Sequence, residues 1–265
     1  MIDLHTHLLW DWDDGPDDRR QALEMARIAE RDGIKVIALT PHVYRLTRHN
    51  GDLGILRQRM IEFHDAMAEA GVEIEFHWGA EVAVHAELVR TVERYRFTLD
   101  STSYVFIEFP SDLVPPGSSN MVYSLMSKGF VPIISHPERN KGFVSHPELL
   151  YEFISMGCAA QVTAMSLTGE FGKETRNAAG LFLAHNLVHI IASDAHTPDA
   201  RPPLLRKAVA AAARIVGEAK AAAMVTEIPR AILDNGALPD WGEPENPARR
   251  RTWAQKLPLL GQKRR

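Results

Sequence analysis

The chain has 265 residues, of which 45% are hydrophobic and 24% are charged, an ordinary composition for a soluble globular protein. Its single cysteine, Cys158, excludes an intramolecular disulfide and favours a reducing compartment. The formal net charge is −4, but residues 249–265 hold seven basic residues and no acidic ones, so the remainder carries about −11. This acidic body argues against a nucleic-acid-binding protein, because phosphate contacts need lysine and arginine.

The sequence also argues against a membrane or secreted protein. The longest apolar runs, such as KVIALT, are far shorter than the ~20 residues that a membrane-spanning helix needs. No charged and then apolar leader precedes IDLHTH. We therefore expect a cytoplasmic location.

Short β-branched runs alternate with amphipathic stretches over residues 1–236. The predicted strands cover residues 1–5, 35–40, 73–79, 104–109, 131–135, 159–163 and 188–193. The predicted helices cover residues 19–33, 53–71, 120–129, 146–157 and 173–186, with Gly33 at the position of a helix C-cap. Strands separated by crossovers long enough for helices indicate a parallel sheet. A closed or nearly closed βα barrel is the first choice, and an open doubly wound sheet the second.

The composition changes after residue 236. Residues 237–265 are rich in proline and arginine and show no sustained periodicity, which is typical of a flexible basic tail. We therefore predict one domain over residues 1–236, followed by a tail over residues 237–265.

Histidines and carboxylates follow most of the predicted strands. They are His5 and His7 after the first strand, His42 after the second, Glu81 after the third, Glu108 at the end of the fourth, His136 after the fifth, and Asp194 and His196 after the seventh. Arg139 accompanies His136 after the fifth strand. Each residue alone could be a buried, hydrogen-bonded polar group. The carboxyl ends of the strands of a βα barrel open onto one face, so the whole set predicts a shared site.

Imidazole nitrogen and carboxylate oxygen are ligands of divalent metal ions. His5 and His7 on an extended segment point to the same side, and Asp194 and His196 repeat this spacing. With Asp14 included, the candidates outnumber the three protein ligands of a single catalytic zinc. Two or three ions close together are suited to hydrolysis of phosphate esters. Arg139 and Arg201 could then bind phosphate, although surface salt bridges explain each arginine alone equally well.

Other phosphatase and nucleotide-binding chemistries find no support in the motifs. Cys158 is followed by AAQVTAM, without the arginine that closes the loop of a cysteine-dependent phosphatase. We expect this thiol to pack as a small apolar group at the sixth strand. The sequence contains no P-loop, dinucleotide-binding glycine motif or GxSxG motif.

Together the strand-end residues resemble the PHP (polymerase and histidinol phosphatase) superfamily, whose members fold as distorted (β/α)7 barrels, a TIM-like α/β architecture. The motifs are IDLHTH, DWDDGP, TPH, GAE, IEF, SHPER and ASDAHTPDARPP. They are most similar to the bacterial PHP-type protein-tyrosine phosphatases of capsule and exopolysaccharide loci. The resemblance runs from residue 2 to about residue 233. DDGP and SDxH…RPP distinguish this branch from the histidinol phosphatases.

The resemblance implies a role for each motif residue and two to three divalent ions, with manganese first among manganese, iron, zinc and cobalt. One ion would be held by His5, His7, Glu81 and Asp194, a second by Glu81, Glu108 and His136, and a third by Asp14, His42 and His196. Arg139 and Arg201 would bind the phosphoryl group, and a metal-bridging hydroxide would attack phosphorus. The implied partner is the phosphotyrosine-bearing C-terminal tail of a bacterial tyrosine kinase that controls polysaccharide synthesis.

Several alternatives stay open at this point. Trp10 and Trp12 could stack on a phosphotyrosine ring, although packing at the barrel rim is the preferred explanation. The basic tail could make weak contact with an anionic membrane surface or have no role. The same scaffold could serve a small-metabolite phosphoesterase such as a histidinol phosphatase, or a non-enzymatic regulator of polysaccharide export. The remaining histidines are expected to be structural, and His77 is the first to check.

Overall fold

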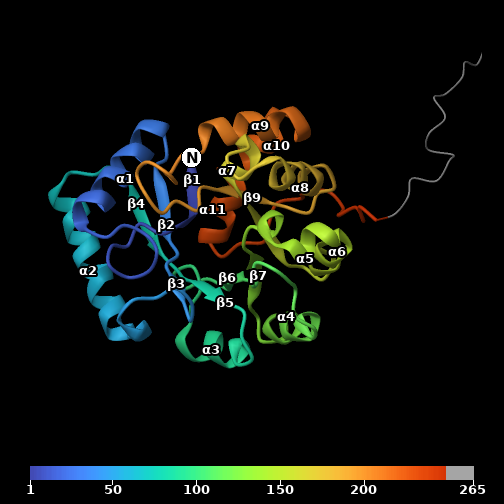
Figure 1. Cartoon of the computed structure of the whole chain (residues 1–265), viewed down its shortest axis with the longest axis horizontal. Helices are drawn as coiled ribbons and strands as arrows, with labels where there is room; N and C mark the ends of the chain where they lie inside the picture. Colours follow the sequence, from blue (N-terminus) through green and yellow to red (C-terminus); the bar gives the residue numbers. More distant parts are fainter. Residues whose placement is uncertain (249–265) are drawn as a thin grey trace, which may run out of the picture.

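The computed structural model describes residues 1–248, which form parallel strands surrounded by helices (Figure 1). One sheet has the strand order β1-β2-β4 and the other has the order β3-β5-β6-β7-β8-β9, and every pairing within them is parallel. The strands are β1 (Ile2–Thr6), β2 (Val36–Leu39), β3 (His42–Val43), β4 (Glu75–Trp78), β5 (Glu81–Ala83), β6 (Tyr104–Glu108), β7 (Val131–Ile134), β8 (Ala159–Thr163) and β9 (Ile190–Ala192). The predicted parallel sheet is confirmed.

Helices occupy most of the connections between strands. They are α1 (Arg19–Asp32), α2 (Leu53–Glu69), α3 (Leu88–Tyr95), α4 (Ser118–Ser127), α5 (Lys141–Ser145), α6 (Pro147–Ser155), α7 (Ala164–Thr168), α8 (Lys173–Ala184), α9 (Arg206–Val216), α10 (Glu218–Ala223) and α11 (Glu227–Leu233). Short 3-10 turns cover His49–Gly51 and Pro137–Arg139. Within residues 1–248, no helix is long and apolar enough to cross a membrane.

The first helix shows why the local sequence signals worked. The side chain of Asp18 accepts a hydrogen bond from the backbone N–H of Gln21 and so caps the start of α1. Gly33 ends the helix in the left-handed region at φ 88°, as predicted for a C-cap. The buried face consists of Ala22, Met25, Ala26 and Ala29, the residues that repeat at helix spacing.

Two of the predicted strands are each continued by a short second strand that the sequence reading missed. Pro41 separates β2 from β3, since proline has no N–H to donate to a sheet. Gly79 separates β4 from β5, and a Cβ there would lie 2.8 Å from a methyl of Leu99. His42 of β3 pairs in register with Glu81 of β5, so the two side chains point to the same side of the sheet.

The strands curl so that the first lies beside the last. The N–H of His7 donates to the carbonyl of Ala195 at 2.9 Å, and the N–H of Asp194 donates to the carbonyl of His5 at 2.9 Å. A parallel bridge between Thr6 and Ala195 lies at the same place. The result is a curled parallel sheet of the TIM-like type, in which β1 and the end of β9 are neighbours (Figure 1).

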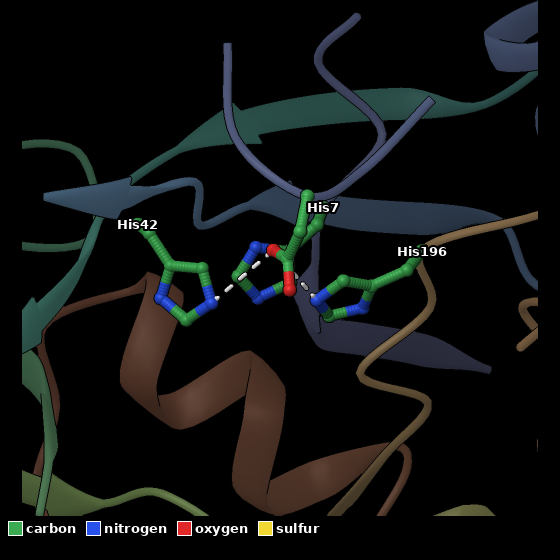
Figure 2. Close-up of side chains that lie close together, drawn as sticks. His7, His42 and His196 are labelled. Carbon is green, nitrogen blue, oxygen red and sulfur yellow. Dashed lines mark ion pairs between the residues drawn. The ribbon is translucent and has the colours of Figure 1, made fainter. Parts of the chain in front are cut away.

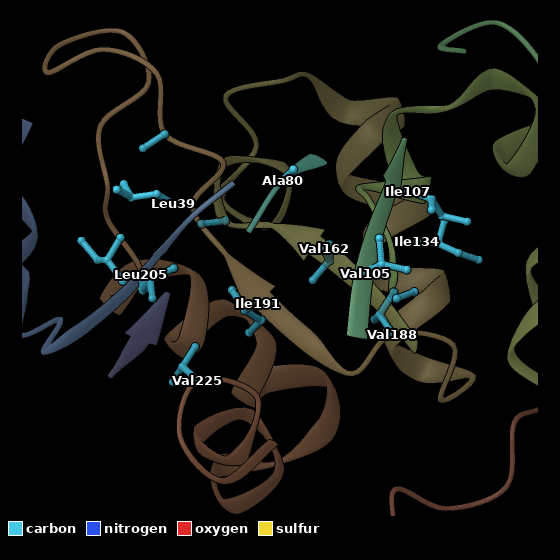
Figure 3. Packing of buried hydrophobic residues seen from close by; sticks show 14 of the residues in the cluster. Leu39, Ala80, Val105, Ile107, Ile134, Val162, Val188, Ile191, Leu205 and Val225 are labelled. Carbon is cyan, nitrogen blue, oxygen red and sulfur yellow. The ribbon is translucent and has the colours of Figure 1, made fainter. Parts of the chain in front are cut away.

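The apolar residues divide into an outer and an inner cluster. Alternate residues of β6 show the division. Val105 and Ile107 pack outward with the helices (Figure 3), while Tyr104 and Phe106 belong to the inner cluster. Ile228 and Ile232 of α11 join the inner cluster. The inner face becomes polar at the carboxyl ends of the strands: Glu108 follows Phe106 by two residues, and Asp194 follows Ala192 by two residues.

Residues 237–248 of the predicted tail lie against the body of the protein. Lys220 Nζ donates to the carbonyl of Trp241 at 2.7 Å, and the Asn186 amide donates to the carbonyl of Glu243 at 2.9 Å. The ammonium group of Lys220 also lies 4.2 Å from the centre of the Trp241 ring. The domain boundary at residue 237 stays a prediction, and residues 249–265 of the predicted tail lie outside the described residues.

Candidate metal centre

Three groups of histidines and carboxylates lie at the carboxyl ends of the strands. In each group the candidate ligand atoms all lie within 4.8 Å of one another. The groups are His7, Asp14, His42 and His196; His5, His7 and Glu81; and His42, Glu81 and Glu108. Figure 2 shows the imidazole rings of His7, His42 and His196 converging from separate segments of the chain. The structure thus brings together the residues that the sequence placed at separate strand ends.

Glu81 lies at the middle of this arrangement and is fully buried. Its Oε2 atom lies 3.4 Å from His5 Nε2, 3.5 Å from His7 Nε2 and 3.1 Å from His42 Nδ1. Its Oε1 atom lies 3.2 Å from His136 Nε2. Burial opposes ionisation of Glu81, but the surrounding imidazoles hold the pKa of this carboxyl well below its usual range.

Asp194 lies at the end of β9 and connects the cluster to two arginines. Its Oδ1 atom lies 3.7 Å from His5 Nε2 and 3.5 Å from His7 Nε2. Its Oδ2 atom accepts hydrogen bonds from Arg139 and, at 2.6 Å, from Arg201. Burial opposes ionisation here too, but the arginines and His5 hold the pKa of Asp194 well below its usual range. Asp194 is therefore a carboxylate shared by the imidazole cluster and the guanidinium groups.

The backbone turns sharply where two of these side chains enter the site. His136 and Asp194 have left-handed φ values of 31° and 52°. Residues other than glycine adopt this region at a cost of order 1–3 kcal/mol, and such residues concentrate at functional sites. The turn after each strand therefore gives the side chain a direction that a continued strand would not provide.

Asp14 forms the more exposed edge of the cluster, with 42% of its side chain accessible. Its Oδ1 atom lies 3.4 Å from His42 Nε2 and 3.3 Å from His196 Nε2. Partial burial opposes ionisation, but the hydrogen bond with His196 and the charges of His196 and His42 lower the pKa of Asp14. This carboxylate is the member of the cluster that is most accessible to solvent.

Several buried polar atoms of the cluster make no hydrogen bond with the described residues. They are both carboxylate oxygens of Glu81, Oε2 of Glu108 and Nδ1 of His42. A buried carboxylate without a partner costs several kcal/mol, and a bound cation would remove this cost. Carboxylate oxygen and neutral imidazole together suit borderline divalent ions. The residues present therefore fit a metal centre.

Two buried residues that the sequence analysis did not select orient the histidines. Asp13 Oδ2 accepts a hydrogen bond from His7 Nδ1 at 2.8 Å and another from the backbone N–H of His42 at 2.9 Å. Gln161 Oε1 lies 3.1 Å from His5 Nδ1 and accepts from the N–H of His136 at 3.2 Å. The contacts with the rings of His7 and His5 engage Nδ1 and leave Nε2 facing the cluster, whereas the other two contacts hold the backbone of His42 and His136. The available signal was a polar residue in the apolar strand AAQVT and a second aspartate beside Asp14.

His136 has a charge state suited to metal binding. Burial and the neighbouring Arg139 guanidinium lower its pKa to about 4, so this imidazole is neutral at pH 7. A metal ligand must be neutral imidazole, because a protonated ring has no free lone pair. This histidine therefore needs no deprotonation before it can bind an ion.

Three arginines and a phenylalanine border the cluster. Arg139 and Arg201 both lie over the ring of Phe171, with their guanidinium carbons 4.9 Å and 5.9 Å from its centre. Arg45 Nη1 lies 2.7 Å from Glu108 Oε1. Arg139 and Arg201 lie in motifs that predict them as site residues, whereas Phe171 and Arg45 lie in no recognisable motif and were not predicted.

The two tryptophans beside the site are packed into the protein. Trp10 is 8% exposed and stacks on Phe63, with ring centres 5.8 Å apart. Trp12 is fully buried, and its indole N–H donates to the carbonyl of His42 at 2.8 Å. These contacts agree with packing at the rim, the explanation preferred from the sequence.

Three other residues have structural contacts outside the cluster. Asp11 forms a 2.5 Å ion pair with Arg59, and His77 bonds to Asp100 at 2.5 Å. Cys158 is buried, and burial raises the pKa of its thiol to about 12. The predictions that Cys158 packs as a small apolar group and that His77 is structural are consistent with these contacts.

A curled parallel sheet with imidazole and carboxylate groups converging at its carboxyl edge is the arrangement of TIM-like metal-dependent hydrolases. The fold and the site together place the protein in this class. More particularly, the chain belongs to the family described as "Capsular polysaccharide synthesis, CpsB/CapC", whose model matches residues 1–234.

Individual relatives agree with this assignment. The chain is 32% identical to the tyrosine-protein phosphatase YwqE of Bacillus subtilis, over 95% of this chain and 98% of the relative. It is 33% identical to the putative tyrosine-protein phosphatase CapC of Staphylococcus aureus, over 78% and 81% of the two chains. A solved structure from a study of YwqE and of CpsB from Streptococcus pneumoniae, described as "unique metal-dependent tyrosine phosphatases", matches with a TM-score of 0.86. That match has 33% identity and covers 93% of this chain and 99% of the other.

Proposed function

We propose that the protein is a metal-dependent protein-tyrosine phosphatase that acts on a tyrosine-phosphorylated protein of capsule or exopolysaccharide synthesis. The observation that carries this proposal is the buried Glu81 carboxylate, which has four imidazoles around it and no hydrogen-bond partner within residues 1–248. The family assignment and the named activities of the relatives support the same activity.

Two to three divalent ions would be held by the strand-end residues. His5, His7, Glu81 and Asp194 would hold one ion, Glu81 would be shared with a second ion at Glu108 and His136, and Asp14, His42 and His196 would hold a third. Bound ions would supply Lewis-acid charge and lower the pKa of a coordinated water. Manganese is the first choice, and iron, zinc and cobalt are the alternatives.

The protein's own residues would bind and orient the phosphoryl group. Arg139 and Arg201 lie side by side over Phe171 and share Asp194 as a partner. Guanidinium groups match the oxygens of a phosphoryl group and stabilise the negative charge of its transition state. Phe171 restricts both guanidinium planes, and Asp194 holds them at the edge of the cluster.

The leaving group also fits this proposal. A phenol has a pKa near 10, so a tyrosine phenolate leaves with less help from a general acid than an aliphatic alkoxide would need. The phosphotyrosine-bearing C-terminal tail of a bacterial tyrosine kinase is the proposed substrate protein.

The architecture that we propose is a distorted (β/α)7 barrel over residues 1–236. Counting β2 with β3 and β4 with β5 as interrupted single strands gives the expected number of strands. We further propose a cytoplasmic location and a basic tail that makes at most weak contact with the membrane surface.

A metal analysis combined with chelation tests the proposal. We expect at least two divalent ions per active chain, loss of phosphotyrosyl peptide hydrolysis in EDTA, and its recovery when Mn²⁺ is restored. Fewer than two ions in fully active protein would exclude the multinuclear centre. A kcat/KM for histidinol phosphate far above that for a phosphotyrosyl peptide would instead favour the metabolite phosphatase. A non-enzymatic regulator would show no hydrolysis of p-nitrophenyl phosphate, and His136→Ala would leave its kinase binding unchanged.

A further inference from the structure

A cavity of about 580 Å³ adjoins the candidate metal centre on the side of β3. Its lining includes Trp12, Tyr44, Arg45, Leu46 and Tyr95. Two of these residues also contact the centre, because Trp12 donates to the carbonyl of His42 and Arg45 pairs with Glu108. A molecule whose phosphoryl group lies at the centre therefore has this cavity directly beside it.

The walls of this cavity expose aromatic and apolar side chains. Tyr44 is 51% exposed and Leu46 is 50% exposed, so both side chains offer apolar contact area to a bound molecule. The Tyr44 ring stacks on the His85 ring, with the ring centres 4.7 Å apart. Tyr44 and Leu46 also have left-handed φ values of 65° and 52°, a conformation that costs free energy for such residues.

A second cavity continues the first and brings two arginines to it. Leu53 and Tyr95 line both cavities, and Arg57 and Arg96 line the second. Both arginines are exposed, and neither forms an ion pair with any residue of the described range 1–248. The acidic residue of this cavity, Asp100, is already paired with His77. The Arg96 guanidinium lies over the Phe130 ring, with its carbon 5.3 Å from the ring centre, a contact that leaves its charge without an acidic partner. The second cavity therefore carries positive charge that is not neutralised by an ion pair within residues 1–248, on a protein whose net charge is −4.

We infer that these two cavities form one groove, here called the flank groove, that binds the peptide segment next to the phosphotyrosine. Its aromatic half accommodates apolar or aromatic side chains close to the phosphotyrosine. Its arginine half, formed by Arg57 and Arg96, pairs with acidic side chains further along the peptide. This inference rests on the proposed phosphatase function and names the kind of protein substrate that the site prefers.

Three substrates distinguish a defect in the flank groove from a defect in the metal centre. They are p-nitrophenyl phosphate, a phosphotyrosyl peptide with glutamates on both sides, and the same peptide with glutamines in their place. For the Arg57→Gln/Arg96→Gln double variant, we expect kcat/KM on the glutamate peptide to fall roughly 5- to 10-fold, mainly through KM. We expect no change on p-nitrophenyl phosphate and little on the glutamine peptide, and the loss should shrink at high salt.

A matched control removes the same charge elsewhere. Arg176 and Arg214 are exposed, line a separate cavity and form no ion pair within residues 1–248. The Arg176→Gln/Arg214→Gln variant should keep the activity of the native protein on all three substrates. An equal loss in both double variants, or an equal loss on p-nitrophenyl phosphate, would overturn the inference.

The aromatic half is tested by Tyr44→Ala. This change should lower kcat/KM by roughly 3- to 10-fold on both peptides and leave p-nitrophenyl phosphate unaffected, since the latter has no residues beyond its ring. An unchanged kcat/KM on both peptides would exclude Tyr44 from the groove.

The experiments distinguish an error in the peptide-binding inference from an error in the proposed phosphatase function. If the metal-loaded protein hydrolyses no phosphotyrosyl substrate, the proposed function is wrong. Binding of a labelled glutamate peptide with a non-hydrolysable phosphonate, measured by fluorescence anisotropy, then tests the groove directly. If hydrolysis occurs but neither KM nor this binding depends on Arg57 and Arg96, the function stands and the groove is wrong.

Discussion

The two ends of the curled sheet are built from the same strands and have opposite chemistry. At one end, Phe106, Ala192 and their neighbours form an apolar inner cluster that α11 covers with Ile228 and Ile232. At the other end, two residues further along the same strands, Glu108 and Asp194 meet buried histidines. Burial of apolar area stabilises the first end, whereas burial of charge opposes folding at the second. The comparison separates the end that maintains the fold from the end that performs the chemistry.

The largest expected effect comes from removing the charge at the middle of the polar end. Glu81→Gln should lower kcat by a factor of about 10³ or more, because the carboxylate is proposed as the ligand shared by two ions. In EDTA, the same change should lower the melting temperature, because the surrounding imidazoles stabilise the ionised carboxylate and so hold its pKa well below the usual range. Steady-state kinetics and thermal denaturation measure the two effects, and a variant with full activity would contradict the proposed role.

At the apolar end, a substitution should reduce stability strongly and activity little. Ile232 is fully buried in the inner cluster, and Ile232→Ala should lower the free energy of unfolding by about 2–5 kcal/mol. The activity of the folded fraction should stay close to the native value, because Ile232 packs in the apolar inner cluster and belongs to none of the candidate ligand groups. Urea denaturation gives the stability. A large loss of kcat in folded protein would show that the two ends are coupled.

An intermediate effect on activity is expected for Asp13, which acts on the metal centre indirectly by orienting His7. Asp13→Asn keeps the size of the side chain but weakens its hydrogen bond with His7 Nδ1. We expect a loss of about 10- to 100-fold in metal affinity or activity, the usual range for residues behind a ligand. Titration with Mn²⁺ should move the activity midpoint to higher concentration, which a purely structural role would not do. Asp11→Asn is the control, because Asp11 pairs with Arg59 outside the cluster.

The smallest expected effect is a pH dependence at the apolar end. Burial and Lys220 lower the pKa of His189 to about 4, so this ring is neutral in the folded protein and becomes charged on unfolding below pH 6.5. The unfolded state then binds the extra proton, and stability falls as the pH drops from about 6.5 towards 4. Between pH 7 and 5 the native protein should lose about 1–2 kcal/mol more than His189→Gln does. Equal pH profiles would exclude this role for His189.

The sequence by itself determined the elements with local signals and the kinds of residue at the strand ends. Helix α1 is one example, because its cap, its apolar spacing and Gly33 all lie within a few turns of each other. His5, His7, His42 and Asp194 are others, since a polar residue directly after a buried strand is visible in the chain itself. The resemblance of these motifs to a known superfamily added their proposed roles.

Tertiary structure alone decided the central position of Glu81, the orientation of the histidines by Asp13 and Gln161, and the groove beside β3. These features depend on the curl of the sheet, which brings β1 beside the end of β9 and residues more than 150 positions apart into contact. Local propensity contains no information on such distances, because the contacts form only when the whole sheet closes around its apolar inner cluster.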